Sequence, residues 1–146
     1  LEVHFMSYYK RWIPQENYYY AVDNCGFKDN SIRSEGTYST YASLDDKIDG
    51  FHYYTTFIKY GIGRATYDSA HEIRNKHLTL QEGKSLVAKY DGEFPDRYFK
   101  ETMEFLNMKE EEFHQICDKF RSPHLWVKKS NSWKLRHNVN LDGEDD

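Results

Sequence analysis

A succession of helix starts between residues 43 and 112 constrains the fold of this chain more than any other feature. In a capping box, a hydroxyl and an acid three residues later satisfy free N–H groups in the first turn of a helix. Residue pairs with this spacing are Ser43 and Asp46, Ser69 and Glu72, and Thr79 and Glu82. Pro95 suits the first turn of a further helix, and the acidic run 110–112 suits the positive end of the next. The pattern predicts a mainly α-helical chain.

The remaining elements are predicted from start and stop signals and from the alternation of apolar and polar residues. A helix should cover roughly residues 14–24, because Pro14 suits its first turn and Gly26 its C-terminal stop. A long loop rich in Ser, Thr, Asn, Asp and Gly follows this helix, and long loops inside a compact domain are often functional. Alternation of apolar and polar residues predicts a strand over 1–7 and a β-hairpin over 125–135. The fold class is therefore mainly α, with one leading strand and a terminal β-hairpin.

The sequence suggests three segments. Residues 1–7 form a strand that belongs to a separate N-terminal domain, residues 8–122 form a helical substrate- and phosphate-binding domain, and residues 123–146 form the hairpin and an acidic tail. A lone strand needs neighbours to pair with. Pairing with the terminal hairpin is one alternative, but strands of a missing N-terminal part fit better, because the chain begins in the strand without Met.

Composition bears on the classes of function. A chain of 146 residues with 17% aromatic and 30% charged residues suits one globular core. The net charge of −4 argues against a nucleic-acid duplex as partner, and no apolar run is long enough to span a membrane. Cys25 and Cys117 lie far apart without CxxC spacing, so neither a zinc site nor a disulfide framework is indicated. We expect a cytoplasmic protein with two buried thiols and no nucleic-acid partner.

Residues that suit an anion site surround the end of the helix predicted to begin near Ser43. They are Lys59, Gly61, Gly63 and Arg64. The two glycines allow an anion to approach the backbone closely, and the planar guanidinium of Arg64 can donate two parallel hydrogen bonds to it. The N-terminus of the following helix also attracts anions. In the alternative, the glycines only end the helix and make a turn, while Arg64 pairs with Asp68 or Glu72 on the surface. His71 and Arg74 share a face of the next helix and could extend the site, or be ordinary surface residues.

A polar stripe runs along the helix predicted to end near Tyr60. Its members are Asp45, Asp49, His52, Thr56 and Lys59. The other faces are apolar or aromatic, which predicts that the stripe lines a cleft. The alternative is a solvated face with a contact between His52 and Asp49 or Asp45. A metal site is not expected, because one helix alone rarely supplies a complete ligand set.

Four stretches carry a resemblance that spans nearly the whole chain. They read YYKRWIPQENYYYAVDNCGF, RSEGTYSTYASLDDKIDGFHYYTTFIKYGIGRATYDSAHEIRNKHLTLQEG, KYDGEFPDRYF and FRSPHLW. Together they resemble the C-terminal part of the N-acetyl sugar amidotransferases of bacterial lipopolysaccharide O-antigen biosynthesis. Such enzymes are similar to PP-loop ATP pyrophosphatases, so the resemblance implies the lower part of an α/β PP-loop enzyme.

The resemblance also implies a reaction. ATP with Mg would activate an N-acetyl group on a nucleotide-linked sugar as an adenylate, and ammonia from a glutaminase partner would displace it to give an acetamidino group. The family's ATP-binding half, with its SGGxDS-type pyrophosphate loop, is absent from this sequence. The fragment alone should therefore be inactive and hold no cofactor tightly.

The resemblance implies roles for the candidate residues as well. Lys59, Gly61, Gly63 and Arg64 fall in the family's K-x-G-x-G-R-A-T stretch and would face the phosphates of ATP or of the nucleotide-sugar. Further substrate positioners would be Glu35 and Thr37 in SEGTYS, and Asp45, Lys47, Asp49 and His52 in SLDDKIDGFHYY. The resemblance assigns no catalytic residue.

A non-catalytic interaction module is the alternative function. Tyr18, Tyr19 and Tyr20 would then dock the glutaminase or a second copy of the chain, because exposed aromatic residues are typical anchors of interfaces. Binding of single-stranded RNA by tyrosine stacking near Lys10 and Arg11 is a weaker alternative, given the acidic balance.

Overall fold

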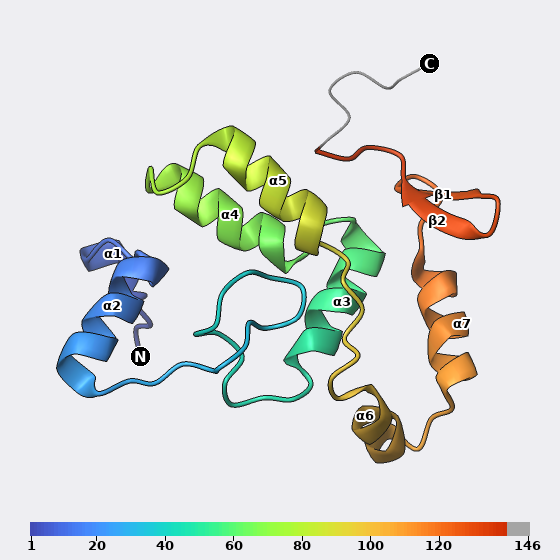
Figure 1. Cartoon of the computed structure of the whole chain (residues 1–146), viewed down its shortest axis with the longest axis horizontal. Coiled ribbons are helices and arrows are strands. Elements are labelled where there is room, and N and C mark those ends of the chain that lie inside the picture. Colours follow the sequence, from blue (N-terminus) through green and yellow to red (C-terminus); the bar gives the residue numbers. More distant parts are fainter. Residues whose placement is uncertain (140–146) are drawn as a thin grey trace.

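The computed structural model describes residues 1–139 and confirms a mainly α-helical chain that ends in a β-hairpin (Figure 1). The elements in chain order are α1 (Met6–Tyr9), α2 (Pro14–Cys25), α3 (Asp49–Tyr60), α4 (Arg64–Arg74), α5 (Leu80–Tyr90), α6 (Phe99–Leu106), α7 (Glu110–Phe120), β1 (Trp126–Lys129) and β2 (Ser132–Leu135). Helices α4 and α5 lie side by side, and α3, α6 and α7 follow toward the hairpin. Among residues 1–139, no helix is long and apolar enough to cross a membrane.

An aromatic core joins α3, α6 and α7. Phe51 and Ile58 of α3, Met103 of α6, and Phe113 and Cys117 of α7 are buried in one cluster. The rings of Phe51 and Phe113 meet edge to face with 6.0 Å between centroids, a favourable geometry for aromatic pairs. Burial raises the pKa of the Cys117 thiol, which suits an inert core residue.

Tryptophans hold the hairpin against the helices. The indole Nε1 of Trp126 donates to the carbonyl oxygen of Ile58 at 2.8 Å, and Trp126 pairs with Leu135 in the ladder. The guanidinium carbon of Arg121 lies 5.0 Å from the ring centre of Trp126 and 5.6 Å from that of Trp133. The predicted terminal hairpin is confirmed, and these contacts make it part of the helical body.

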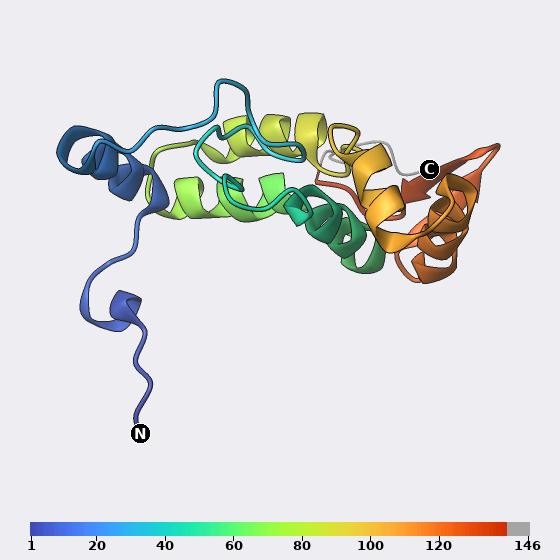
Figure 2. The same cartoon turned by 90° about the horizontal axis from the view of Figure 1, so that it is seen from below.

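The N-terminal segment, residues 1–12, projects away from that body (Figure 2). Each of its side chains is exposed, and Phe5 and Trp12 retain 78% and 58% of their accessible surface. The strand predicted over 1–7 is not formed in this structure: residues 1–5 have no regular structure and Met6–Tyr9 form α1. The physical reason is that, within residues 1–139, no neighbouring strand pairs with it.

Two expectations near the start of the chain have different outcomes. Helix α2 runs from Pro14 to Cys25 and ends at Gly26, whose φ of 67° is left-handed, as predicted for a glycine stop. Cys25 was expected to be buried, but it is exposed because it lies in the last turn of a helix with no fully buried residue.

The helix start predicted at Ser43 is wrong. Helix α3 begins at Asp49, because the Asp46 carboxylate accepts a hydrogen bond from the backbone N–H of Ile48 at 2.7 Å in a local turn. Ser43 itself has a φ of 55° and donates its hydroxyl to the Asp49 side chain. Residues 43–48 are therefore a polar turn ahead of α3 and do not form its first turns.

Two more predicted starts are displaced, and one is confirmed. Helix α4 begins at Arg64, so Ser69 and Glu72 lie in its interior and are buried. Helix α6 begins at Phe99 and not at Pro95. The capping box before α5 is formed as predicted, with its hydroxyl and carboxylate bonded to each other's backbone N–H groups.

Candidate functional site

Arg64 opens α4 and is buried, with 8% of its surface exposed. Its Nη1 lies 3.5 Å from Oδ2 of Asp49, and its Nε lies 3.8 Å from Oδ2 of Asp68. Nη1 also donates to the hydroxyl of Ser43, and the guanidinium carbon lies 4.3 Å from the ring centre of Tyr53. Two carboxylates and an aromatic face of the chain itself therefore surround this cation.

Asp68 connects the Arg64 cluster to the long loop that precedes α3. Thr37 in that loop is fully buried and donates its hydroxyl to Oδ2 of Asp68 at 2.5 Å. The carbonyl of Gly36 accepts from the backbone N–H of Ala65 at 3.1 Å. Burial raises the pKa of Asp68, and the Thr37 hydrogen bond and the Arg64 charge act against that rise. The loop is thus fixed on the first turns of α4.

A second ion pair holds the same loop from the other side. Arg33 donates two hydrogen bonds to the carboxylate of Glu93, at 2.5 and 2.6 Å, and the backbone N–H of Gly36 donates to Glu93 at 2.7 Å. Hydrogen bonding to Arg33 holds the pKa of Glu93 below its ordinary value, and the same contact raises the pKa of Arg33. Bidentate geometry fixes direction as well as distance, so this pair orients the loop.

The N-terminus of α4 already holds a carboxylate from the chain. The backbone N–H groups of Gly63 and Thr66 donate to Asp91 at 3.0 and 3.1 Å, and the Thr66 hydroxyl donates to it at 2.5 Å. A Cβ on Gly63 would lie 2.6 Å from Oδ1 of Asp91, so only glycine permits this approach. Within this structure, the backbone donors predicted for a ligand anion therefore bind Asp91.

We expect Asp91→Ala to lower the free energy of unfolding by about 1–2 kcal/mol, the usual effect of losing a helix N-cap. The two N–H groups would lose their acceptor at the start of α4. Urea unfolding followed by circular dichroism measures the loss. Asp91→Asn keeps an acceptor oxygen and should lose less. An alanine variant as stable as the parent would contradict this role.

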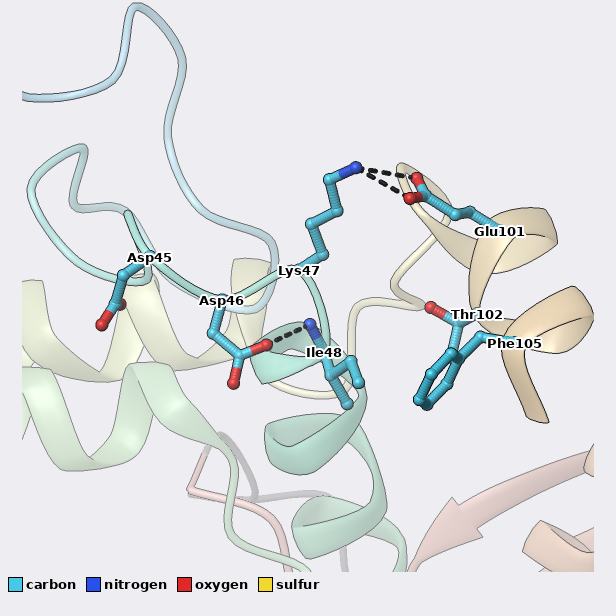
Figure 3. A pocket seen from close by; sticks show the side chains of 7 residues that line it. All are labelled: Asp45, Asp46, Lys47, Ile48, Glu101, Thr102 and Phe105. Carbon is cyan, nitrogen blue, oxygen red and sulfur yellow. Dashed lines mark hydrogen bonds and ion pairs between the residues drawn. The ribbon is translucent and has the colours of Figure 1, made fainter.

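Two adjoining hollows form a groove around the turn ahead of α3, and we call them together the groove. The first, of about 290 Å³, is lined by Asp45, Asp46, Lys47, Ile48, Glu101, Thr102 and Phe105. The second, of about 30 Å³, is lined by Ser34, Glu35, Ser43, Asp46, Lys47, Gly50, Arg97 and Tyr98. Figure 3 shows the turn on one side of the first hollow and the side chains of α6 on the other.

The groove combines cations, carboxylates and aromatic rings. Nζ of Lys47 donates to both carboxylate oxygens of Glu101, at 2.8 and 3.1 Å, and lies 5.3 Å from the ring centre of Tyr98. The backbone N–H of Arg97 donates to Glu35 at 2.9 Å. The Phe105 ring is 76% exposed. These groups can bind phosphate, hydroxyls and a flat or apolar ring face.

A larger hollow of about 820 Å³ lies beside α6 and the start of α7. Its lining includes Glu110, Glu111 and Glu112, which occupy the first turn of α7, where negative charge is favoured by the helix dipole. It contains none of the residues predicted for a site, so we place the candidate site in the groove.

Residues 35–140 match the family model for the C-terminal domain of WbpG-like lipopolysaccharide (LPS) biosynthesis proteins. The match covers most of the chain. The chain belongs to the WbpG-like family. No curated protein matches it. The WbpG-like match begins at Glu35, so it includes Arg64, Asp91 and the groove apart from Ser34, and it leaves out α1 and α2.

The WbpG-like domain brings six of the predicted residues together. Glu35, Asp45 and Lys47 line the groove. Thr37 and Arg64 are buried behind the turn that lines it, and the partly exposed Asp49 pairs with Arg64 there. The predicted pairing of Arg64 with Asp68 is present, with the arginine buried and the Asp68 side chain 33% exposed.

The other predicted residues lie elsewhere. His52 is exposed beside the Tyr53 ring, and Nζ of Lys59 lies 5.4 Å from the Tyr60 ring centre with its side chain in solvent. Gly61 lines a different hollow, near the hairpin, and Gly63 contacts Asp91. His71 and Arg74 lie in the second half of α4 and line neither part of the groove.

Sequence reasoning missed several residues that the groove and its support use. They are Arg33, Asp91, Glu93, Arg97, Tyr98, Glu101 and Phe105. The signal that could have found four of them is the motif KYDGEFPDRYF, which concentrates charged and aromatic residues between two helices. Among residues 1–139, no group of three or more His, Cys, Asp or Glu residues could hold a metal ion.

Proposed function

We propose that this WbpG-like chain is the substrate-binding part of an ATP-dependent N-acetyl sugar amidotransferase. Acting in the cytoplasm, the enzyme would convert the acetamido group of a nucleotide-linked sugar to an acetamidino group, with ammonia from a glutaminase partner. The family match supports a role in LPS biosynthesis. The groove is the observation that carries the substrate-binding proposal.

In this proposal, Lys47 and Arg97 bind the diphosphate of the nucleotide-sugar. Lys47 is now paired with Glu101, but both side chains are about 60% exposed. Exposed pairs of this kind contribute at most about 1 kcal/mol, so a phosphate could displace Glu101 with little loss. Arg97 is exposed and needs no rearrangement to offer the free part of its guanidinium.

The remaining groups of the groove suit a sugar. Carboxylates such as Asp45 and Asp46 accept hydrogen bonds from hydroxyl groups, and Phe105 offers an exposed ring face for stacking. A hollow of about 290 Å³ lies at the lower end of the range for small-molecule sites. We assign substrate phosphate to Lys47 and Arg97 in preference to Arg64, because Arg64 is already paired with Asp49 and Asp68.

The N-terminus of α4 could cradle a phosphate of ATP, but its backbone donors are bonded to Asp91. Within residues 1–139, no group of three or more His, Cys, Asp or Glu side chains could hold a metal ion. We therefore place ATP, Mg and the activation step on a PP-loop domain outside these residues. The described residues bind and orient the sugar in this proposal, and none of them is given a catalytic role.

The test is binding of UDP-N-acetylglucosamine, used as a probe nucleotide-sugar, measured by isothermal titration calorimetry. We expect Lys47→Ala and Arg97→Ala each to weaken binding roughly tenfold, the equivalent of about 1.4 kcal/mol for one charge-assisted contact. Lys59→Ala is the matched control, because Lys59 is an exposed lysine outside the groove. Equal affinity of all three variants with the parent would refute the groove assignment.

A non-catalytic docking module is the second candidate. Trp12, Tyr19 and Tyr20 are 58%, 56% and 65% exposed, which favours a contact with another protein. Tyr18 is not part of that surface, because its ring stacks on Tyr41 with 4.5 Å between centroids. Light scattering after size-exclusion chromatography distinguishes the two: a concentration-dependent dimer supports docking, and a monomer that binds the nucleotide-sugar supports the groove.

A further inference from the structure

A second site lies at the opposite end of α4 from the groove. Both views place α2 next to the turn that joins α4 to α5 (Figures 1 and 2). A hollow of about 460 Å³ lies between them, and we call it the α2 pocket. Its polar and aromatic lining residues are Gln15, Glu16, Tyr19, Tyr38, Glu72 and His77. It shares no lining residue with the groove.

The end of α4 fixes the position of His77. Lys76 has a left-handed φ of 65°, and its N–H donates to the Ile73 carbonyl at 3.0 Å. The N–H of His77 donates to the Glu72 carbonyl at 2.9 Å. This pair of bonds is the Schellman motif, which turns the chain back over the last turn of a helix. This turn places the imidazole of His77 beside the side chain of Glu72.

Glu72 and His77 form a carboxylate–imidazole pair in which the carboxylate is buried and the imidazole is partly exposed. The Glu72 side chain is only 10% exposed, and its Oε2 lies 2.7 Å from Nδ1 of His77. The other ring nitrogen, Nε2, lies 3.7 Å from Oε1 of Glu16. With a neutral imidazole, Nδ1–H donates to Glu72 and Nε2 carries a lone pair. Two acceptors then face each other near a hollow, an arrangement that a hydrogen-bond donor would satisfy.

Two buried hydroxyl groups lie beside this pair. Oη of Tyr38 and Oγ of Ser69 face each other, and neither has another hydrogen-bond partner among residues 1–139. Ser69 is 2% exposed and lies three residues before Glu72, so the two share a face of α4. Burial raises the pKa of Tyr38 to about 12, so its phenol stays neutral at physiological pH. A hydroxyl has one donor and two acceptor positions, so this pair can still accept a hydrogen bond from a ligand or a water.

The charged residues that line the α2 pocket determine whether it favours a cationic or an anionic ligand. Its lining carries two carboxylates, Glu16 and Glu72, and no Lys or Arg. A phosphate or carboxylate ligand would therefore be repelled. A metal ion does not fit, since His77 directs one nitrogen to Glu72 and the other toward Glu16, and no metal-binding group occurs among residues 1–139. A cation with N–H donors satisfies both the charge and the free acceptors.

We propose that the α2 pocket binds a protonated primary amine. The ammonium group would donate to Nε2 of His77 and Oε1 of Glu16, with Glu72 supplying further negative charge from behind the imidazole. The rings of Tyr19 and Tyr38 line the same hollow and add cation–π attraction. This inference goes beyond the amidotransferase proposal and does not depend on it, because it uses neither the groove nor ATP.

Titration with methylammonium chloride, followed by the NMR signals of the His77 ring at mildly alkaline pH, tests the proposal. We expect a saturable shift of these signals. Tetramethylammonium carries the same charge without N–H donors and potassium has neither donors nor methyl groups, so both should give little shift at equal ionic strength. Glucosamine distinguishes two sources of the amine: tighter binding than methylammonium indicates an amino sugar, and equal binding indicates a free small amine.

Glu16→Gln is the decisive variant, because Glu16 is 62% exposed at its side chain and its replacement leaves the fold intact. We expect methylammonium to bind at least about tenfold more weakly to this variant. Glu111→Gln, an exposed acid on α7, is the matched control and should titrate like the parent. The proposal is overturned if Glu16→Gln also titrates like the parent, or if tetramethylammonium produces the same shift as methylammonium.

Discussion

Arg64→Met is expected to lower the free energy of unfolding by about 3 kcal/mol, the lower end of the range for removing one partner of a buried ion pair, because Asp49 and Asp68 are 30% and 33% exposed. Methionine replaces the volume of the side chain but leaves Asp49 and Asp68 without their cation. The Thr37 contact to Asp68 would weaken with it, because the partly buried Asp68 carboxylate would lose its counter-charge. Urea unfolding followed by tryptophan fluorescence measures the loss.

Two further variants separate this explanation from simple loss of packing. Lys59→Met removes an exposed cation five residues earlier and should change stability by less than about 0.5 kcal/mol. Adding Asp68→Asn to Arg64→Met removes one of the unpaired charges and should recover part of the loss. A loss below about 1 kcal/mol for Arg64→Met would show that Arg64 does not hold the cluster together.

Glu93→Gln should have the second-largest effect, about 2–3 kcal/mol near neutral pH, because hydrogen bonds to a charged group are lost. Glutamine cannot accept both hydrogen bonds from Arg33 and the one from Gly36 as a charged group does. The loop that lines the groove would lose one attachment to the segment between α5 and α6 and keep the contacts of Arg97 to Glu35 and Arg33. Chemical unfolding of parent and variant, compared at each pH, measures the difference.

The effect of Glu93→Gln should depend on pH. Because the pKa of Glu93 is lower in the folded protein than its ordinary value of 4.5, ionisation favours the folded state. This contribution is fully present above pH 4.5 and is lost as the pH falls through the lowered pKa. Parent and variant should therefore converge in stability near pH 2. Glu101→Gln, which removes the exposed partner of Lys47, should cost less than about 1 kcal/mol at any pH. An equal loss for Glu93→Gln at both pH values would contradict the ionic explanation.

Local signals predicted that a helix exists more reliably than they predicted the residue at which it begins. The glycine stop of α2, the capping box of α5 and the acidic start of α7 were all predictable, because each depends on residues within one turn. Ser43 has the spacing of a capping residue, but its hydroxyl instead binds Asp49 and Arg64. Ser69 and Glu72 have that spacing as well, yet they are buried in the interior of α4. Tertiary contacts decided these positions, and sequence spacing could not show them.

The candidate site was predictable only in part, for the same reason. Glu35, Asp45 and Lys47 were proposed from the sequence and do line one groove. The glycine stretch was predicted to bind the anion of a ligand. In this structure the N–H of Gly63 binds the carboxylate of Asp91, which is 28 residues away. Likewise, Arg33 and Glu93 are 60 residues apart. The residues around Gly63 and Arg33 do not indicate which distant residue each will contact. Charge and glycine spacing therefore predicted an anion contact but could not identify the carboxylate that makes it.

An amide chemical-shift map of the chain titrated with UDP-N-acetylglucosamine tests whether the groove binds the substrate phosphate. We expect the largest shifts to cluster at residues 45–48 and 97–105, around Lys47 and Arg97. Amides of Gly61 to Thr66 should shift little, because Asp91 already occupies the donors of that stretch. Shifts concentrated at Gly61 to Thr66, with residues 45–48 unchanged, would rule out the groove and place the substrate phosphate at the start of α4.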